Sequence, residues 1–174
     1  MRLALVAAVL SVSSAASAQP LEPRPRVASW FSAGAGVSTG ASAMQEATTV
    51  GAQIVAPLGV GAGVFQVGVS TEFELLGGPE GLTEGHVAGG LATRSGPLAL
   101  AVVAGPSVAC VTLVEPVGNG TRAVARTRPG AYVGLHALLT PGRTVGVGAE
   151  VYGQVNAGLS TAGLRLFLAV GRLR

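Results

Sequence analysis

The stretch from Val64 to Leu75 alternates between two kinds of side chain with a period of two. One face carries apolar residues and one threonine: Phe65, Val67, Val69, Thr71, Phe73 and Leu75. The other face carries small or polar residues: Gln66, Gly68, Ser70, Glu72 and Glu74. Successive side chains of a β-strand point to opposite sides, so this period predicts a strand. The strand must separate an apolar environment from one that can hold two carboxylates.

Seven further runs resemble this one, and most of them alternate. The predicted strands are Val27–Thr39, Ala47–Leu58, Val64–Leu76, His86–Ser95, Leu98–Val114, Pro129–Leu139, Thr144–Asn156 and Ser160–Gly171. Most are close to the ~9–11 residues with which a tilted strand crosses a bilayer. The sequence therefore predicts an all-β protein of eight strands.

The connections between these runs alternate in length. The longer ones are Gly40–Glu46, Gly77–Gly85 and Glu115–Arg128, and the shorter ones are Gly59–Gly63, Gly96–Pro97, Thr140–Arg143 and the turn at Ala157–Gly158. Long loops on one rim and tight turns on the other are typical of barrels that cross an outer membrane.

The run Leu98–Val114 allows two interpretations. It is apolar almost throughout, and Gly105 and Pro106 interrupt its middle. It is either one long bent strand, with or without a bulge, or a hairpin that turns at Gly105–Ser107. We expect the single strand, because a hairpin would give nine strands and bacterial single-chain barrels have even numbers.

The composition fits a chain with little surface in water. The 174 residues suffice for one domain, and only 11% of them are charged, compared with about 25% in soluble domains. Every basic residue is arginine and every acidic one glutamate, with a small basic surplus. No basic run alternates with aromatic residues, so no nucleic-acid partner is predicted.

The N-terminal segment predicts secretion. Residues 1–18 combine Arg2, the apolar run Leu3–Val12 and the small residues Ala16–Ala18, which is the pattern of a cleaved signal peptide. We expect residues 19–26 to be a disordered lead-in and residues 27–174 to form a single domain. Cys110 is the only cysteine, so no intramolecular disulfide can form.

With its signal segment, eight alternating runs and alternating loops, the chain resembles the small eight-stranded outer-membrane β-barrels of the OmpA/OmpX type. The resemblance is one of architecture and covers about residues 27–171. It implies an eight-stranded antiparallel up-and-down transmembrane β-barrel in the bacterial outer membrane. It also implies a monomer that contacts outer-membrane lipid and serves as an anchor or surface-interaction protein.

The minor faces of the runs carry polar residues that would meet inside such a barrel. This expected lumen network comprises Gln66, Glu72, Glu74, Arg94, His136, Glu150, Tyr152 and Arg165, with Gln53 on the same side. An eight-stranded lumen is just wide enough for its own side chains. We therefore expect the arginines to pair with the glutamates, with a proton path or binding site as the alternative.

The longest loop carries a basic cluster of Arg122, Arg126 and Arg128 against a single acidic residue, Glu115. This surplus predicts contact with lipid head groups or another acidic surface partner. The alternative is a solvated loop without a binding role.

No catalytic residue, cofactor or metal is predicted. His86 and His136 are the only histidines, and without Cys or Asp they make a poor metal site. We expect His86 to be exposed at the rim, although with Glu84 and Ser42 it could form a hydrolase triad. No G-x-S-x-G motif supports that triad. The alternatives to a surface-interaction barrel are a soluble lipocalin-like barrel that binds a lipid and an outer-membrane hydrolase or acyltransferase.

Overall fold

The computed structural model describes residues 29–40, 47–58, 62–73, 81–117, 120–157 and 159–173. These residues form eight β-strands. The strands are β1 (Ser29–Gly40), β2 (Ala47–Pro57), β3 (Gly63–Phe73), β4 (Gly81–Ser95), β5 (Leu98–Val117), β6 (Gly120–Leu139), β7 (Val145–Asn156) and β8 (Leu159–Arg172).

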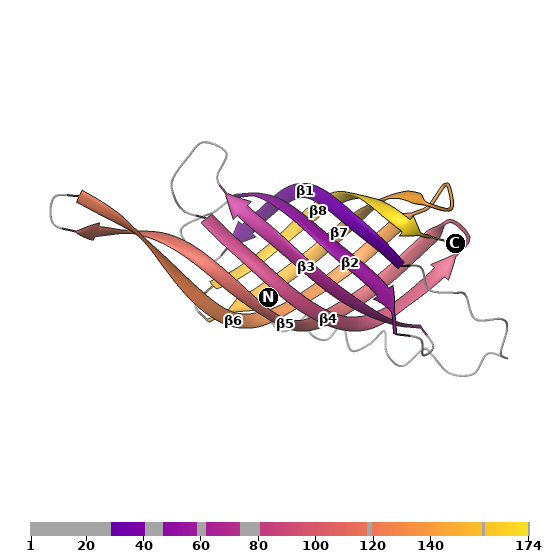
Figure 1. Ribbon diagram of the computed structural model, residues 1–174, viewed down its shortest axis with the longest axis horizontal. Coiled ribbons are helices and arrows are strands. Elements are labelled where there is room, and N and C mark those ends of the chain that lie inside the picture. The colour runs from indigo at the N-terminus through magenta and orange to yellow at the C-terminus, as the bar shows by residue number, and fades with distance from the viewer. Residues whose placement is uncertain are drawn as a thin grey trace.

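The eight strands close into one antiparallel barrel. Each strand pairs with the next, and β8 pairs with β1 from Ser29↔Arg172 to Gly40↔Thr161. Figure 1 shows the closed wall, with the β5–β6 end and the C-terminal end at opposite rims. The predicted eight-stranded antiparallel barrel is confirmed.

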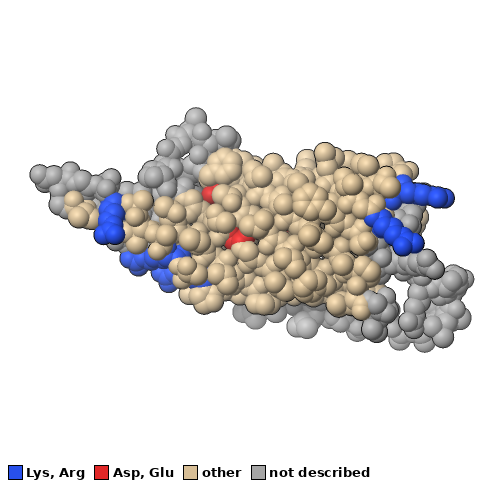
Figure 2. All heavy atoms as spheres, viewed as in Figure 1, with Lys and Arg blue, Asp and Glu red and all other residues tan. Residues whose placement is uncertain are grey.

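The two faces of each strand meet different surroundings. Large apolar side chains point outward along every strand, for example Ile54 on β2, Leu135 on β6 and Leu168 on β8. The residues between them point inward, and most are buried. In Figure 2 the basic side chains lie at the two ends of the molecule, and the wall between them is almost uncharged. This orientation contradicts the lipocalin-like alternative, which requires the apolar faces to line the interior.

Strand β5 runs unbroken through Gly105 and Pro106. It pairs with β6 continuously from Leu98↔Leu139 to Val117↔Gly120, so the hairpin interpretation was wrong and the single strand is confirmed. On the β4 side the pairing stops at His86↔Ser107 and resumes at Gly89↔Ala104 in the same register. Proline has no N–H to donate, which accounts for the gap, and the unchanged register on both sides of it shows that the strand carries no bulge here.

Three strands are longer at one end than the sequence predicted. β4 begins at Gly81, so the preceding connection is shorter than expected. β5 and β6 continue as a hairpin across most of the predicted loop Glu115–Arg128, which is corrected here to strand. β6 pairs with β7 only from Gly130 onward. Its preceding residues pair with β5 alone, and the tip of this β5–β6 hairpin projects beyond the other strands in Figure 1.

The interior has three levels. An apolar cluster near the short-turn rim contains Trp30, Leu138 and Phe167 and extends to the rings of Tyr132 and Tyr152. Near the opposite rim a second apolar cluster consists of Ala47, Leu82, Ala109 and Val111. Buried polar side chains fill the space between the two clusters.

The expected signal segment and lead-in lie outside the described residues and stay predictions. Within the part of the chain that the structure describes, no helix is long and apolar enough to cross a membrane.

Candidate functional site

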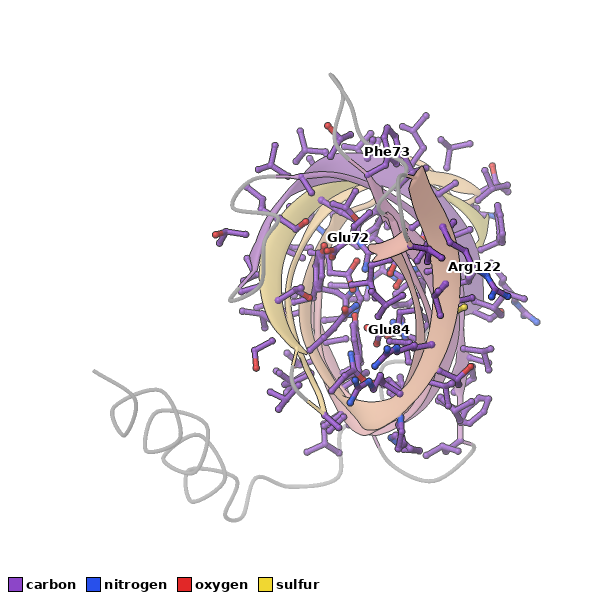
Figure 3. The ribbon with its side chains drawn as sticks, turned by 90° about the vertical axis from the view of Figure 1, so that its left-hand side faces the viewer. Glu72, Phe73, Glu84 and Arg122 are labelled. Atoms are coloured by element: carbon purple, nitrogen blue, oxygen red, sulfur yellow. The ribbon has the colours of Figure 1, made fainter. Side chains whose placement is uncertain are left out.

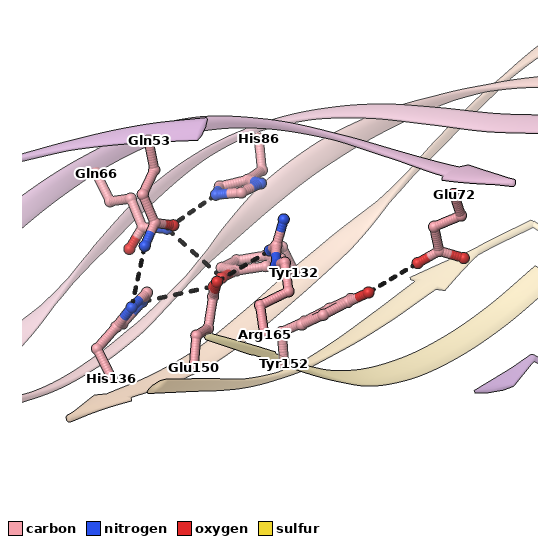
Figure 4. A network of polar contacts seen from close by, with 9 residues as sticks. All are labelled: Gln53, Gln66, Glu72, His86, Tyr132, His136, Glu150, Tyr152 and Arg165. Carbon is pink, nitrogen blue, oxygen red and sulfur yellow. Dashed lines mark hydrogen bonds and ion pairs between the residues drawn. The ribbon is translucent and has the colours of Figure 1, made fainter. Parts of the chain in front are cut away.

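The centre of the lumen is an ion pair between neighbouring strands. Arg165 on β8 lies directly opposite Glu150 on β7, with 3.0 Å between Nη2 and Oε2. Both side chains are almost fully buried. The hydroxyl of Tyr132 on β6 donates to the same carboxylate, and His136 lies 3.8 Å from it. Figure 4 shows these four residues converging from three strands.

Two glutamines extend this centre across the barrel. The amide nitrogen of Gln66 donates to Gln53 at 2.8 Å and faces Nε2 of His86 at 2.9 Å. The amide nitrogen of Gln53 faces Nδ1 of His136 at 3.3 Å. An amide N–H donates, so each of these two imidazole nitrogens is placed to accept a hydrogen bond from a glutamine.

Aromatic rings and the Arg165 guanidinium stack inside the lumen, next to glycine residues. The rings of His86 and Tyr132 are parallel with centroids 3.7 Å apart, and the Arg165 guanidinium lies 4.3 Å over the Tyr152 ring. A Cβ at Gly163 would lie 2.5 Å from Tyr152, and one at Gly51 would overlap the Arg165 guanidinium. These two glycines therefore provide the space in which the ring and the cation lie.

A second polar group lies toward the β5–β6 end. The Tyr152 hydroxyl donates to Glu72 at 2.9 Å, and Ser107 donates to Asn156 at 3.3 Å. Glu84 is buried among them. Figure 3, a view along the barrel from that end, shows Glu72 and Glu84 pointing into the interior.

The structure brings together most of the residues expected to form the lumen network. Those that meet in the interior are Gln66, Glu72, His136, Glu150, Tyr152 and Arg165. Glu74 lies outside the described residues. Within the described part of the chain, no three His, Cys, Asp or Glu side chains are grouped so that they could hold a metal.

Arg94 does not join this network. It lies at the short-turn rim, where it donates to the carbonyl oxygens of Gly96 and Leu173 and to the hydroxyl of Thr140. The expected pairing of Arg94 with a lumen glutamate is therefore corrected to a set of contacts that join the turn between β4 and β5 to the ends of β6 and β8.

The expectation that His86 is an exposed rim residue was wrong. Because β4 starts five residues earlier than predicted, Glu84 and His86 both face the lumen and are buried. Ser107 lies opposite His86 in the register, yet its hydroxyl donates to Asn156. Ser42, the serine considered for a triad, lies outside the described residues.

The predicted lumen network also lacks Tyr132 and Glu84, which the structure places in the interior. Tyr132 has the same parity as His136 on β6, so the strand pattern alone could have placed it inside. The glycines around Glu84 were interpreted as a loop. The alternation of Leu82, Glu84 and His86 with Thr83 and Gly85 was the signal that would have placed Glu84 in a strand.

The three arginines of the predicted loop lie on β6. Arg122 and Arg126 are exposed and Arg128 is half-buried. Even-numbered residues share one side of this strand, so the three arginines form a one-sided row, called here the arginine row. The positions facing it on β5 are Glu115, Val111 and Ala109.

Together, the closed wall, the apolar outside and the packed polar lumen define a small eight-stranded barrel of the outer-membrane type. Three solved structures share this fold with the chain.

Ail, the attachment invasion locus protein of Yersinia pestis, is similar with a TM-score of 0.61 at 9% identity, covering 84% of this chain and 99% of Ail. Neisserial surface protein A has a TM-score of 0.63 at 13% identity, covering 82% and 96%. The N-terminal barrel domain of Pseudomonas aeruginosa OprF has a TM-score of 0.56 at 14% identity, covering 81% and 96%. No protein-family model matches the chain, and a search of curated proteins finds no match either. The likeness to the three structures is one of fold.

Proposed function

We propose that this protein inserts into the bacterial outer membrane as a closed barrel and acts at the cell surface through its β5–β6 hairpin. The apolar outer wall supports insertion, since large aliphatic side chains such as Leu166 and Leu168 are about two-thirds exposed. Removing such side chains from water stabilises the inserted state by about 25 cal/mol per Å² of apolar surface.

The filled lumen supports a role at the surface rather than in transport. The interior of an eight-stranded barrel is just wide enough for side chains. Here the interior is occupied by large side chains from β6, β7 and β8, namely Tyr132, His136, Tyr152, Arg165 and Phe167. Solutes therefore have no open path along the axis, and contacts with other molecules fall to the rims and the hairpin.

The observation that carries the proposal is the arginine row of Arg122, Arg126 and Arg128. Along a strand, Arg122 and Arg126 are separated by about 13 Å and Arg126 and Arg128 by about 7 Å. The row occupies the part of β6 that pairs with β5 alone, from Arg122 near the hairpin tip to Arg128, which faces the buried Ala109. Guanidinium groups bind phosphate and sulfate in a bidentate manner, so a row of three suits a ligand with several anionic groups.

A comparison with Ail is consistent with this ligand class. One of the similar solved structures is Ail in complex with the heparin analogue sucrose octasulfate, and it matches the present chain with a TM-score of 0.61. For this chain we propose the same kind of ligand, a polyanion such as the phosphorylated head group of a surface lipid.

The location is tested by cell fractionation. The protein should be recovered in the outer-membrane fraction, require detergent for solubility and migrate differently on gels before and after heating. Recovery as a detergent-free monomer from the periplasm would contradict insertion.

The ligand class is tested with lipid-A-containing vesicles at low and moderate salt. Wild type should bind more tightly than the triple variant Arg122→Ala/Arg126→Ala/Arg128→Ala, and salt should reduce the difference because it screens exposed charges. Sucrose octasulfate serves as a soluble competitor. The matched control is Arg143→Ala/Arg172→Ala, which removes exposed cations at the opposite rim. Equal binding of wild type and the triple variant at low salt would contradict a role for the arginine row.

A further inference from the structure

Two arginines lie side by side at the short-turn rim. Arg172 is the last residue of β8, and Arg143 lies in the turn before β7. The N–H of Gly171 donates to the carbonyl oxygen of Thr144 at 2.9 Å. The N–H of Leu173 donates to the carbonyl oxygen of Arg143, also at 2.9 Å. These two hydrogen bonds, on either side of Arg172, hold its backbone beside that of Arg143. The two residues are called here the arginine pair.

The arginine pair has no described counter-charge. Both side chains are exposed, and Arg172 has the same parity as Leu168 and Val170, which face outward on β8. Figure 2 shows basic side chains at this end of the barrel. The glutamate side chains that the structure describes are all buried in the lumen, and Arg94 adds a third cation at this rim. Like charges held side by side repel each other, so a bound anion would stabilise the pair.

The outer wall next to the arginine pair carries an apolar depression of about 900 Å³. The small residues Ala33, Ala35 and Ala137 leave this space, and larger aliphatic side chains such as Leu168 and Val147 stand beside them. In the register Ala33 lies next to Leu168, which lies next to Val147, so the depression crosses adjacent strands. Its lining contains no polar side chain. The depression therefore suits a hydrocarbon chain.

The depression and the arginine pair are spaced like the chain and the head of a lipid. Leu168 and Arg172 lie four residues apart on β8, which corresponds to about 13 Å along the strand. At a strand tilt of about 45°, this is about 9 Å along the bilayer normal. The head-group layer on each side of the hydrocarbon core is about 5–8 Å thick. A phosphate at the arginine pair therefore lies in this layer, while the depression lies in the hydrocarbon.

We propose that the arginine pair and the depression bind one phospholipid of net negative charge. Its phosphate accepts hydrogen bonds from the guanidinium groups of Arg143 and Arg172, which suit the geometry of phosphate oxygens, and an acyl chain lies in the depression. Short turns of such barrels face the periplasm, so the lipid belongs to the inner leaflet of the outer membrane. This inference rests on the proposed insertion into the membrane and is independent of the arginine row at the opposite rim.

A second copy of this chain is the other occupant that the face could accept. Small residues allow two transmembrane surfaces to approach closely. Two copies that share this face in one membrane would bring their arginine pairs to the same rim, next to the contact. Four guanidinium groups would then gather without a described counter-charge. The charge at the rim therefore favours an anionic lipid over a second copy.

The test titrates lipids onto the full chain in detergent micelles and counts bound lipids by native mass spectrometry. Wild type should bind one phosphatidylglycerol per chain and prefer it about tenfold to phosphatidylcholine with the same acyl chains, because arginines near a membrane surface attract anionic lipid. Arg143→Ala/Arg172→Ala should bind the two lipids equally. The control is the triple variant Arg122→Ala/Arg126→Ala/Arg128→Ala, which removes cations at the opposite rim and should keep the preference.

A second pair of variants tests the depression. Ala35→Phe fills it, and Ala131→Phe adds the same ring to an exposed position of β6 outside its lining. Ala35→Phe should weaken phosphatidylglycerol binding severalfold, because the acyl chain loses its contacts with the wall. Ala131→Phe should bind like wild type. Glycerol phosphate, which has the head group without the chains, should not displace the lipid.

Four results would overturn the proposal. The first is equal affinity of wild type for the two lipids, and the second is an unchanged preference in Arg143→Ala/Arg172→Ala. The third is equal binding by Ala35→Phe and Ala131→Phe, or displacement of the lipid by glycerol phosphate, which would leave only an anion contact at the rim. The fourth is a dimer that Ala35→Phe dissociates, which would assign the face to a second copy.

Failure of this proposal is distinguishable from failure of the proposed function. Arg143→Ala/Arg172→Ala should keep wild-type binding to lipid-A-containing vesicles, and the triple variant of the arginine row should lose it while keeping the preference for phosphatidylglycerol. Failure of membrane insertion would appear in cell fractionation, whereas lipid binding is measured in micelles. Each arginine group thus has its own readout.

Discussion

Replacing Arg165 by alanine should be among the most damaging single changes in the barrel. The guanidinium is 4% exposed, forms the ion pair with Glu150 at 3.0 Å and lies over the Tyr152 ring. The substitution removes both interactions while the rest of the wall stays unchanged. It leaves the Glu150 carboxylate in the lumen with the Tyr132 hydroxyl as its remaining short contact.

The expected magnitude follows from the burial of the pair. Removing one member of a buried ion pair costs about 3–5 kcal/mol, because the other charge is left uncompensated. The hydrogen bond from Tyr132 offsets part of this cost, so we expect a loss of about 3 kcal/mol. With a denaturant slope of about 2 kcal/mol per molar urea, the unfolding midpoint should fall by about 1.5 M.

The assay is urea unfolding of the protein reconstituted in lipid vesicles, followed by tryptophan fluorescence and by the gel shift on heating. Trp30 is buried in the apolar cluster at the short-turn rim, so its emission reports loss of the barrel interior. The control is Arg143→Ala, at an exposed turn, which should change stability by less than about 0.5 kcal/mol.

A double variant distinguishes the energy of the ion pair from the effect of removing the volume of the Arg165 side chain. Glu150→Gln removes the charge that Arg165→Ala leaves behind, so the double variant should be less destabilised than the sum of the two single variants. Equal and negligible effects of Arg165→Ala and Arg143→Ala would refute the reasoning. Strict additivity in the double variant would show that the two charges do not interact.

Three further outcomes are expected. Gly163→Ala should destabilise the barrel by about 1–3 kcal/mol, because the new Cβ would lie 2.5 Å from the rigid Tyr152 ring; Gly153→Ala, whose nearest neighbour is 3.5 Å away, is the control in the same urea assay. Leu166→Arg, on the outer wall at 66% exposure, should cost about 2–4 kcal/mol in a bilayer, and an equal midpoint for wild type and variant would contradict lipid contact there. Planar bilayers containing the protein should show no large, stable single-channel steps, and regular steps would contradict a filled lumen.

The architecture of the barrel could be predicted from the sequence because most strands alternate between apolar residues that face outward and small or polar residues that face inward. The alternation in Gly63–Phe73 and Val145–Asn156 needs no tertiary information to interpret. The ends of strands were less accessible. Nothing local indicates that β5 and β6 continue pairing beyond the wall, because that depends on two distant segments reaching the same length.

The site was accessible only in part. Parity places Glu150 and Arg165 inside, yet their pairing depends on the register between β7 and β8, which the turn between these strands sets. Arg94 has inward parity as well, but it lies one strand end away from the glutamates and binds backbone carbonyls instead. Sequence spacing gives the side of the wall and not the height along the axis.

The seam between β1 and β8 imposes an order on assembly. Ser29 pairs with Arg172, so these contacts form only after the whole barrel sequence is available, and such long-range pairing slows folding. Arg165, the only fully buried arginine among the described residues, lies on the strand that closes the seam. One edge of β8 brings Arg165 to Glu150 on β7, and its other edge closes the sheet against β1. A chain halted before Leu159 would have open strand edges at β1 and β7, and Glu150 would still lack its cation.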